Sequence, residues 1–395
     1  MEIVVPVLEM NKWNINAADC IGGTPLIWAA RRGLEEIVRI FLERKDINPN
    51  QAGTKYGRTP LSWAAAAGRE GIVKTLLEQK DIDPNQADTS RGWALLSYNN
   101  GNQTTVYAEG RGLNPDEAQT KYGRTPLSLA AEGGHEGIVK ILLEREDVNP
   151  DQADPEYGWT PLWLAASNGH EEIVKILLEQ KDIDPNHADT YRGDTPLFCA
   201  AYEGHEGVVK MLLERKDINL NSVDITSGAT PLFIAAQNGR EGVVKMLLEQ
   251  GCANPDRAAT KSGATPLNIA AEAGHERIVK MLLEWGNVNP DQADTSSGRT
   301  PLSRAAGNGH EEVVRMLLER QNVNPDHIDT EYGQTPLTYA AGNGYEGIVK
   351  ILLDRKDVNP NHGNISGGTP LLWAAERDHE GVVNILLEQK DVNPN

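Results

Sequence analysis

One tripeptide, Thr-Pro-Leu, recurs along this chain at nearly constant spacing. It begins at Thr24, Thr59, Thr125, Thr160, Thr195, Thr230, Thr265, Thr300, Thr335 and Thr369. Most steps are 35 residues, whereas the step from 59 to 125 is 66 residues and the last is 34. Such a period is typical of a repeat architecture, in which each unit folds only against its neighbours. The 395 residues are therefore expected to form a single solenoid (1–395) rather than two or three globular domains.

The unit at residues 122–154 indicates how each repeat folds. Thr125 is followed by Pro, which predicts a helix cap and a first helical position. The first helix is expected over 127–132 and is ended by a Gly-Gly pair. A second helix, over 135–143, carries an apolar arc wide enough to be covered on two sides. The Ala-Ala pair of the first helix lets neighbouring units approach closely, which accounts for an aromatic content of only 5%.

The pattern Gly-x-Thr-Pro-Leu-x-x-Ala-Ala-x-x-Gly-His-x-x-Ile-Val-x-x-Leu-Leu, as it stands in 123–143, resembles the ankyrin repeat. The resemblance extends over essentially the whole chain. It implies an all-α ankyrin-repeat solenoid of stacked antiparallel helix pairs with protruding β-hairpin or loop fingers. The unit is 35 residues long here, against about 33 in the family, so the arm after the second helix is expected to be longer.

The register of the repeats gives the organisation of the chain. After a partial repeat at 1–20, repeats are expected to begin near residues 22, 57, 92, 123, 158, 193, 228, 263, 298, 333 and 367. The unit at 92–118 is four residues short and has lost the helical spacing. Two interpretations stay open for it: a decayed repeat with a loose loop, or a cleft that interrupts the stack and offers a ligand site or a hinge.

The partial repeat at the start is expected to be a frayed N-terminal cap, whereas the last unit is no more polar than the interior units. The natural protein is therefore expected to be longer, or another chain covers the C-terminal end. A monomer is expected, with end-to-end association through the weakly capped termini as an alternative.

The charge balance limits the classes of partner. The chain has 38 Lys and Arg against 57 Asp and Glu, a net charge of −19. A nucleic acid or an anionic membrane would be repelled, so neither is expected as a partner. The three cysteines are irregularly spaced and suggest neither a disulfide framework nor a metal site. An intracellular location, cytoplasmic or nuclear, is the expectation.

No catalytic or metal-binding motif is apparent in the sequence. Six units carry a histidine at the start of the second helix, at positions 135, 170, 205, 275, 310 and 379. Neighbouring ones are about 10 Å apart if helices pack at the usual distance, which is too far to share a metal ion. A structural hydrogen bond at the helix start is the expected role. We therefore expect no cofactor, no metal and no enzymatic activity.

In ankyrin arrays the fingers and the exposed side of the first helix form a concave binding face. Carried over onto this sequence, that face comprises Tyr56, Arg58, Tyr122, Arg124, Tyr157, Trp159, Tyr191, Asp194, Tyr202, Arg299 and Tyr332. Tyr, Trp and Arg dominate interface energetics, and Trp159 with Tyr157, Tyr191 and Tyr202 is the densest aromatic group. The alternative is that the finger tyrosines only pack along neighbouring fingers.

A second row of varied residues occupies a position that is core Leu in the family. Its members are Trp28, Trp63, Leu129, Leu164, Ile234, Ile269, Tyr339 and Trp373. We expect this row to pack inside the stack. Arg304 falls in the same row, so its guanidinium must reach solvent or find a partner.

These observations favour a non-enzymatic scaffold for protein–protein interaction, which binds a protein or an extended peptide segment on the concave face. Two alternatives are kept. The first is a small-molecule-binding or catalytic ankyrin protein that uses the concave groove or the degenerate unit at 92–118. The second is the sensor array of a larger signalling protein.

Overall fold

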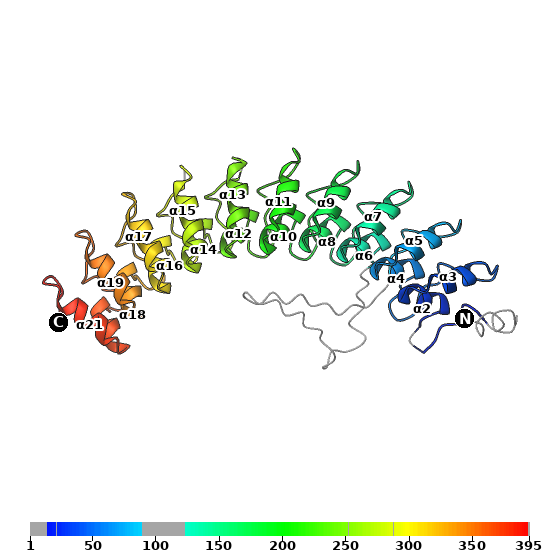
Figure 1. Cartoon of the computed structure of the whole chain (residues 1–395). Helices are drawn as coiled ribbons and strands as arrows, with labels where there is room; N and C mark the ends of the chain where they lie inside the picture. The colour runs from blue at the N-terminus through cyan, green and yellow to red at the C-terminus, as the bar shows by residue number, and fades with distance from the viewer. Residues whose placement is uncertain (1–13, 21, 89–122, 252, 287, 394–395) are drawn as a thin grey trace. The chain divides into compact units, whose positions relative to one another are not determined.

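The computed structural model describes residues 14–20, 22–88, 123–251, 253–286 and 288–393. Within these ranges the chain forms ten helix pairs and no strand. Two compact units are distinguished, Met1–Pro196 and Leu197–Asn395. In each unit, helix pairs follow one another in chain order (Figure 1). The all-α stack of helix pairs expected from the sequence is confirmed. The fingers are loops built on turns, so in the described part the loop form of the finger is present and the β-hairpin form is not.

The first helices of the pairs are short. They are α2 (Pro25–Arg32), α4 (Pro60–Ala66), α6 (Pro126–Glu132), α8 (Pro161–Ser167), α10 (Pro196–Glu203), α12 (Pro231–Gln237), α14 (Pro266–Ala273), α16 (Pro301–Asn308), α18 (Pro336–Gly342) and α20 (Pro370–Glu376). The second helices are α3 (Glu35–Leu42), α5 (Glu70–Leu77), α7 (Glu136–Leu143), α9 (Glu171–Leu178), α11 (Glu206–Leu213), α13 (Glu241–Glu249), α15 (Glu276–Glu284), α17 (Glu311–Leu318), α19 (Glu346–Leu353) and α21 (Glu380–Leu387).

The start of each first helix follows from the Thr-Pro-Leu motif. In α6 the Thr125 hydroxyl accepts a hydrogen bond from the amide of Ser128 at 3.2 Å, and Thr125 itself is extended, with φ −76° and ψ 163°. Pro126 follows at the first helical position, where a missing amide hydrogen costs nothing. The turn to the second helix passes through Gly134 at φ 73°, a conformation that disfavours any residue with a Cβ.

Packing joins like helices of successive repeats into two layers. In the first unit α4 contacts α2 and α6 in one layer, while α5 contacts α3 and α7 in the other. Leu127, Ala130 and Ala131 of α6, and Ile138 and Leu142 of α7, are 0 or 1% exposed. The core is therefore a series of thin aliphatic slabs between repeats, as the low aromatic content predicts.

The recurrent histidine links neighbouring repeats. His135 Nε2 lies 3.2 Å from the carbonyl oxygen of Ala66, and His170 Nε2 lies 2.9 Å from that of Glu132. His310 makes the same 2.9 Å contact with the carbonyl oxygen of Glu272 in the second unit. The side chain at the start of one second helix thus satisfies a carbonyl group at the end of the preceding first helix. The structural role expected of these histidines is present, with the bond directed to the neighbouring repeat.

The Asn- and Asp-rich arms form a second link between repeats. Asn85 Nδ2 donates to the carbonyl oxygen of Asp147 at 2.5 Å, and Asn85 Oδ1 accepts from the amide of Asn149 at 3.1 Å. In the second unit, Asp326 Oδ2 accepts from the amide of Asn359 at 2.7 Å. These side chains replace the backbone ladder that a strand would provide, which explains why the arms need Asn and Asp but form no strand.

The unit expected at 92–118 lies outside the described residues, but its two flanks show that no helix pair separates them. Helix α4 packs directly on α6, and α5 packs directly on α7. The amide of Asp88 donates to the carbonyl oxygen of Arg124 at 2.9 Å. The same bond closes an ordinary finger, from the amide of Asp154 to the carbonyl oxygen of Trp159 at 3.1 Å.

The closure of this finger is unusual in sequence. Positions 88 and 124 are 36 residues apart, whereas positions 154 and 159 are five apart. Among the described residues, the stack passes directly from α4 and α5 to α6 and α7. Both interpretations of the unit expected at 92–118 stay predictions.

A deletion tests whether the stack needs residues 89–119. Removing them leaves Thr120, Lys121 and Tyr122 between Asp88 and Gly123, the same three residue types as in the finger at 54–56. Because α4 and α5 already contact α6 and α7 directly, we expect an unchanged urea midpoint.

The matched control removes 31 residues of the next repeat, 126–156, and with them α6 and α7. It should lower the urea midpoint clearly, because a whole pair of slabs is lost. An equal fall in the two deletions would show that residues 89–119 contribute a packed layer.

Candidate partner-binding surface

Most of the described fingers are organised around a buried aspartate at their start, namely Asp88, Asp154, Asp189, Asp224, Asp294 and Asp329. Asp154 is 2% exposed and accepts hydrogen bonds from the amides of Glu156, Tyr157 and Trp159 at 3.1, 2.8 and 2.9 Å. Burial raises the pKa of the Asp154 carboxyl, while the amide hydrogen bonds act in the opposite direction. The finger backbone is thereby fixed without strands, and Tyr157 is held at the tip.

An aromatic column connects this finger to the first helix behind it. The rings of Tyr157 and Trp159 are stacked with centroids 4.6 Å apart, and those of Trp159 and Trp163 are stacked at 4.9 Å. Trp163 Nε1 donates to the carbonyl oxygen of Asp194 at 2.9 Å. Tyr191 of the next finger meets Tyr157 edge-on at 6.3 Å. The finger tips thus form a rigid aromatic surface.

Arg124 closes the column from the preceding repeat. Its guanidinium lies 5.1 Å from the Trp159 ring and pairs with Glu132 at 2.5 Å. Four of the predicted candidates, Arg124, Tyr157, Trp159 and Tyr191, are therefore brought together. Trp163 was not among the candidates. Its position four residues after Trp159, across the helix cap, is the sequence signal that could have identified it.

The candidates differ widely in exposure. Tyr191 is 69% exposed, Tyr332 50% and Tyr56 38%, whereas Trp159 and Asp194 are each only 7% exposed. Those of intermediate exposure are Arg58, Arg124, Tyr157, Tyr202 and Arg299. Tyr122 lies outside the described residues. Trp159 and Asp194 can therefore support a binding surface but offer a partner little area of their own.

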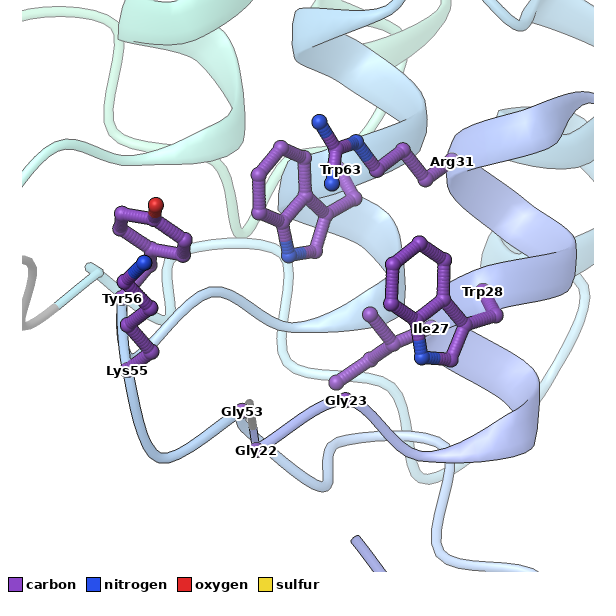
Figure 2. Close-up of a pocket in the computed structure, with 9 residues that line it drawn as sticks. All are labelled: Gly22, Gly23, Ile27, Trp28, Arg31, Gly53, Lys55, Tyr56 and Trp63. Carbon is purple, nitrogen blue, oxygen red and sulfur yellow. The ribbon is translucent and has the colours of Figure 1, made fainter. Parts of the chain in front are cut away.

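A second aromatic and cationic group lies around Trp63 in the first unit. Arg31 lies 4.5 Å from the Trp63 ring centroid, Arg58 lies 4.9 Å from it, and Tyr56 meets it edge-on at 5.8 Å. Figure 2 shows the Arg31 guanidinium beside the Trp63 indole, on the side of the hollow that faces Trp28. The hollow measures about 30 Å³, which is room for one or two waters.

The row expected to pack inside the stack divides in two. Leu129 and Leu164 are buried, at 3 and 2% exposed, as predicted. Trp28, Trp63 and Trp373 are only half-buried, and their rings line surface hollows. Ile269 is also only half-buried, whereas Ile234 and Tyr339 are each 9% exposed. For Trp28, Trp63 and Trp373 the prediction of interior packing is wrong.

Arg304, the cation expected to need a partner, finds two. Its guanidinium pairs with Asp294 at 2.9 Å and also with Glu272 of the preceding repeat. Burial acts to raise the pKa of the Asp294 carboxyl. Hydrogen bonds from Ser297, Ser296 and Arg304 outweigh that effect and lower it to about 2.

The second unit contains a larger hollow, of about 610 Å³, between the fingers and first helices of its last three repeats. Tyr339 forms part of its floor, and Arg299 lies 4.1 Å from the Tyr339 ring centroid. The Tyr339 hydroxyl donates to Asp329 at 3.0 Å, and burial raises its pKa. This volume is in the usual range of ligand sites.

Metal and membrane sites are not found in the part of the chain that the structure describes. Residues 14–20, 22–88, 123–251, 253–286 and 288–393 hold no group of three or more His, Cys, Asp or Glu side chains placed to bind a metal ion. In the same ranges no helix has the length and apolarity needed to span a membrane.

Stacked antiparallel helix pairs with one loop finger per pair define a helical repeat protein. A family model described as ankyrin repeats (3 copies) matches residues 2–88, 95–189, 182–258, 252–329 and 321–395. The chain therefore belongs to the ankyrin-repeat family, and the resemblance found in the sequence is confirmed.

Comparison with solved structures gives the same fold. The chain is similar to the ankyrin repeat domain of human ASB11, with a TM-score of 0.51 and 29% sequence identity. The alignment covers 60% of this chain and 100% of that domain. No curated protein sequence matches the chain.

The Asp294–Arg304 pair gives a pH-dependent prediction. Because the folded pKa of Asp294 is depressed, its stabilisation is present above the unfolded pKa of about 3.9 and is lost as the pH falls through about 2. Asp294→Asn should lower the free energy of unfolding by about 2 kcal/mol at pH 7. In urea denaturation from pH 7 to pH 2, the difference from wild type should shrink below about pH 4.

Asp154→Asn is the control for this measurement. Asn364 already holds the equivalent finger with hydrogen bonds from the amides of Ser366 and Gly368, and the pKa of Asp154 is raised rather than lowered. A smaller loss at pH 7 is expected. A loss for Asp294→Asn that is independent of pH would contradict the assignment.

The aromatic column predicts that its buried and exposed rings contribute very differently to the free energy of unfolding. Trp159→Ala removes a buried ring stacked on two others, so the free energy of unfolding should fall by about 3–5 kcal/mol. Tyr191→Ala removes a ring that is 69% exposed and should change it by no more than about 0.5 kcal/mol. Urea denaturation of the two variants checks this, and similar losses would show that the column is not what fixes the finger.

Proposed function

We propose that this chain is a non-enzymatic scaffold that binds a protein partner on the face formed by its fingers and first helices. Ankyrin repeats are generally protein–protein interaction modules, and the chain belongs to that family. The family is typically non-catalytic. An intracellular location and a monomeric state remain predictions.

The observation that carries the proposal is the fixed aromatic surface at Tyr157 and Tyr191. Tyr191 is 69% exposed, and its ring meets that of Tyr157 edge-on. The Tyr157 ring stacks on the Trp159 ring, and the Tyr157 amide donates a hydrogen bond to the Asp154 carboxylate. A surface that is rigid before binding loses little conformational entropy on binding. Exposed tyrosines supported in this way are typical of interface hot spots.

The fingers are also tied to one another along this face. The amide of Thr190 donates to the carbonyl oxygen of Tyr157 at 2.7 Å, and its hydroxyl donates to the carbonyl oxygen of Glu156 at 2.9 Å. In the second unit the amide of Thr330 donates to the carbonyl oxygen of Ser297 at 2.9 Å. Neighbouring tips therefore keep a constant spacing, which suits a partner that contacts several repeats at once.

The double variant Tyr157→Ala/Tyr191→Ala tests the proposal. A partner is captured with the wild-type chain, identified by mass spectrometry and purified, and its affinity is measured by isothermal titration calorimetry. We expect the affinity to fall by about tenfold to a hundredfold, because hot-spot tyrosines contribute about 2 kcal/mol or more.

Ile225→Ala is the control, since Ile225 is a finger residue of the second unit that is 66% exposed and does not line the 610 Å³ hollow. It should leave the affinity within about twofold. An unchanged affinity in the double variant would overturn the placement of the binding surface, and an equal loss in Ile225→Ala would show that binding is not centred on Tyr157.

A further inference from the structure

The 610 Å³ hollow of the second unit is lined by arginines but by no acidic residue. Arg299 and Arg377 both face it, and its floor includes Tyr339 and Trp373. No Asp or Glu is among the residues that line it. The chain as a whole has a net charge of −19, so the charge of this hollow is opposite in sign to that of the chain.

The repeat itself supplies an internal comparison for Arg299. Arg124 and Arg299 occupy the same position, directly before the capping Thr of a first helix. Eight residues after Arg124 stands Glu132, whose carboxylate pairs with it at 2.5 Å. Eight residues after Arg299 stands Gly307. The intramolecular carboxylate is thus missing from the repeat of Arg299.

The other available acid is also occupied. Arg58, again in the same position, pairs at 3.0 Å with Asp88, the carboxylate at the start of the next finger. The equivalent residue for Arg299 is Asp329, which accepts instead from the Tyr339 hydroxyl at 3.0 Å. Among the described residues, Arg299 forms no ion pair. Its guanidinium lies 4.1 Å from the Tyr339 ring centroid and hydrogen-bonds to the Tyr339 side chain.

A second glycine opens the same hollow one repeat further on. Gly342 occupies the position of Gly307 in the next repeat, and Arg377 Nη1 donates to its carbonyl oxygen at 3.0 Å. The Arg377 guanidinium lies 5.1 Å from the Trp373 ring centroid and, within the described residues, forms no ion pair. A Cβ at Gly307 would meet Tyr339 at 3.7 Å, and one at Gly342 would meet Trp373 at 3.6 Å, both ordinary contacts. Side chains are therefore sterically possible at both positions, and their absence creates the space.

We propose that this hollow, hereafter the arginine groove, binds an acidic segment of a partner protein. A Glu or Asp side chain of that segment takes the place next to Arg299 that Glu132 takes next to Arg124. The inference rests on the proposed function as a protein-binding scaffold and adds a second contact region with a defined chemistry. Arg is suited to this recognition because its planar guanidinium binds a carboxylate with two parallel hydrogen bonds.

A peptide segment fits the groove better than a nucleic acid does. The surrounding chain is strongly acidic and would repel a phosphate backbone. The volume of about 610 Å³ exceeds what one carboxylate needs. Its aromatic floor can receive a neighbouring apolar side chain, and Asn and Gln side chains on its walls can bond a peptide backbone.

The test uses the full chain and short fluorescent peptide libraries. In each library one central residue is fixed as Glu, Gln or phosphoserine, and the flanking positions are randomised. Binding is followed by fluorescence anisotropy at low and high salt. We expect the Glu library to bind at least about tenfold more tightly than the Gln library at low salt, with the difference reduced at high salt.

Three variants locate the binding. Gly307→Glu supplies an internal carboxylate to Arg299 and should abolish the preference for Glu. Gly307→Gln has the same size without the charge and should retain the preference. Arg299→Gln should lose it. Because Gly disfavours a helix relative to Glu and Gln, neither Gly307 variant should lower the thermal unfolding midpoint, so loss of binding in Gly307→Glu cannot be ascribed to unfolding.

Several results would overturn the proposal. These are equal binding of the Glu and Gln libraries, no binding of any library, equal effects of Gly307→Glu and Gly307→Gln, or a stronger preference for phosphoserine. If the arginine groove fails while Tyr157→Ala/Tyr191→Ala still weakens the captured partner, the scaffold function stands and only this site is wrong. If the groove binds acidic peptides and Tyr157→Ala/Tyr191→Ala has no effect on the captured partner, the arginine groove stands and the binding surface at Tyr157 and Tyr191 is wrong.

Discussion

Each helix in the described part of this protein spans seven to nine residues, and helices of that length are not stable alone in water. Their stability comes from the aliphatic slabs between repeats, where Leu127, Ala130 and Ala131 of one first helix meet the next. Because every repeat depends on close contact with its neighbour, positions at the slab tolerate only small or aliphatic residues. The residues that differ from repeat to repeat therefore lie in the fingers and on the outer side of the first helix.

The position before the capping Thr shows how the same residue type can have different surroundings in different repeats. Arg58, Arg124 and Arg299 share that position, yet their guanidinium groups find different surroundings. Arg58 pairs with the acid of the next finger, and Arg124 pairs with an acid at the end of its own first helix. Arg299 has neither acid and lies on an aromatic ring. The same backbone position therefore holds an arginine that is paired with an acid at Arg58 and Arg124. At Arg299 the arginine is not paired with an acid.

Much of the architecture follows from local sequence. The Thr cap, the Pro after it and the Gly at positive φ each act within a few residues, so the helix limits could be predicted from the pattern. The 66-residue step between Thr59 and Thr125 counts residues along the chain and not repeats in space. The hydrogen bond between Asp88 and Arg124 joins residues 36 apart, and no local pattern predicts that closure.

The candidate surface shows the same division. The sequence by itself determined the repeat, the family, the helix caps and the row of finger residues from which Tyr157 and Tyr191 come. Only the tertiary structure decided that Trp159 is a buried support and that Trp28 and Trp373 line hollows. It also showed that Arg299 lacks the acid that Arg124 has. The physical reason is that caps and turns depend on neighbours in the chain, whereas burial and ion pairing depend on side chains from other repeats, at distances that only the stacking fixes.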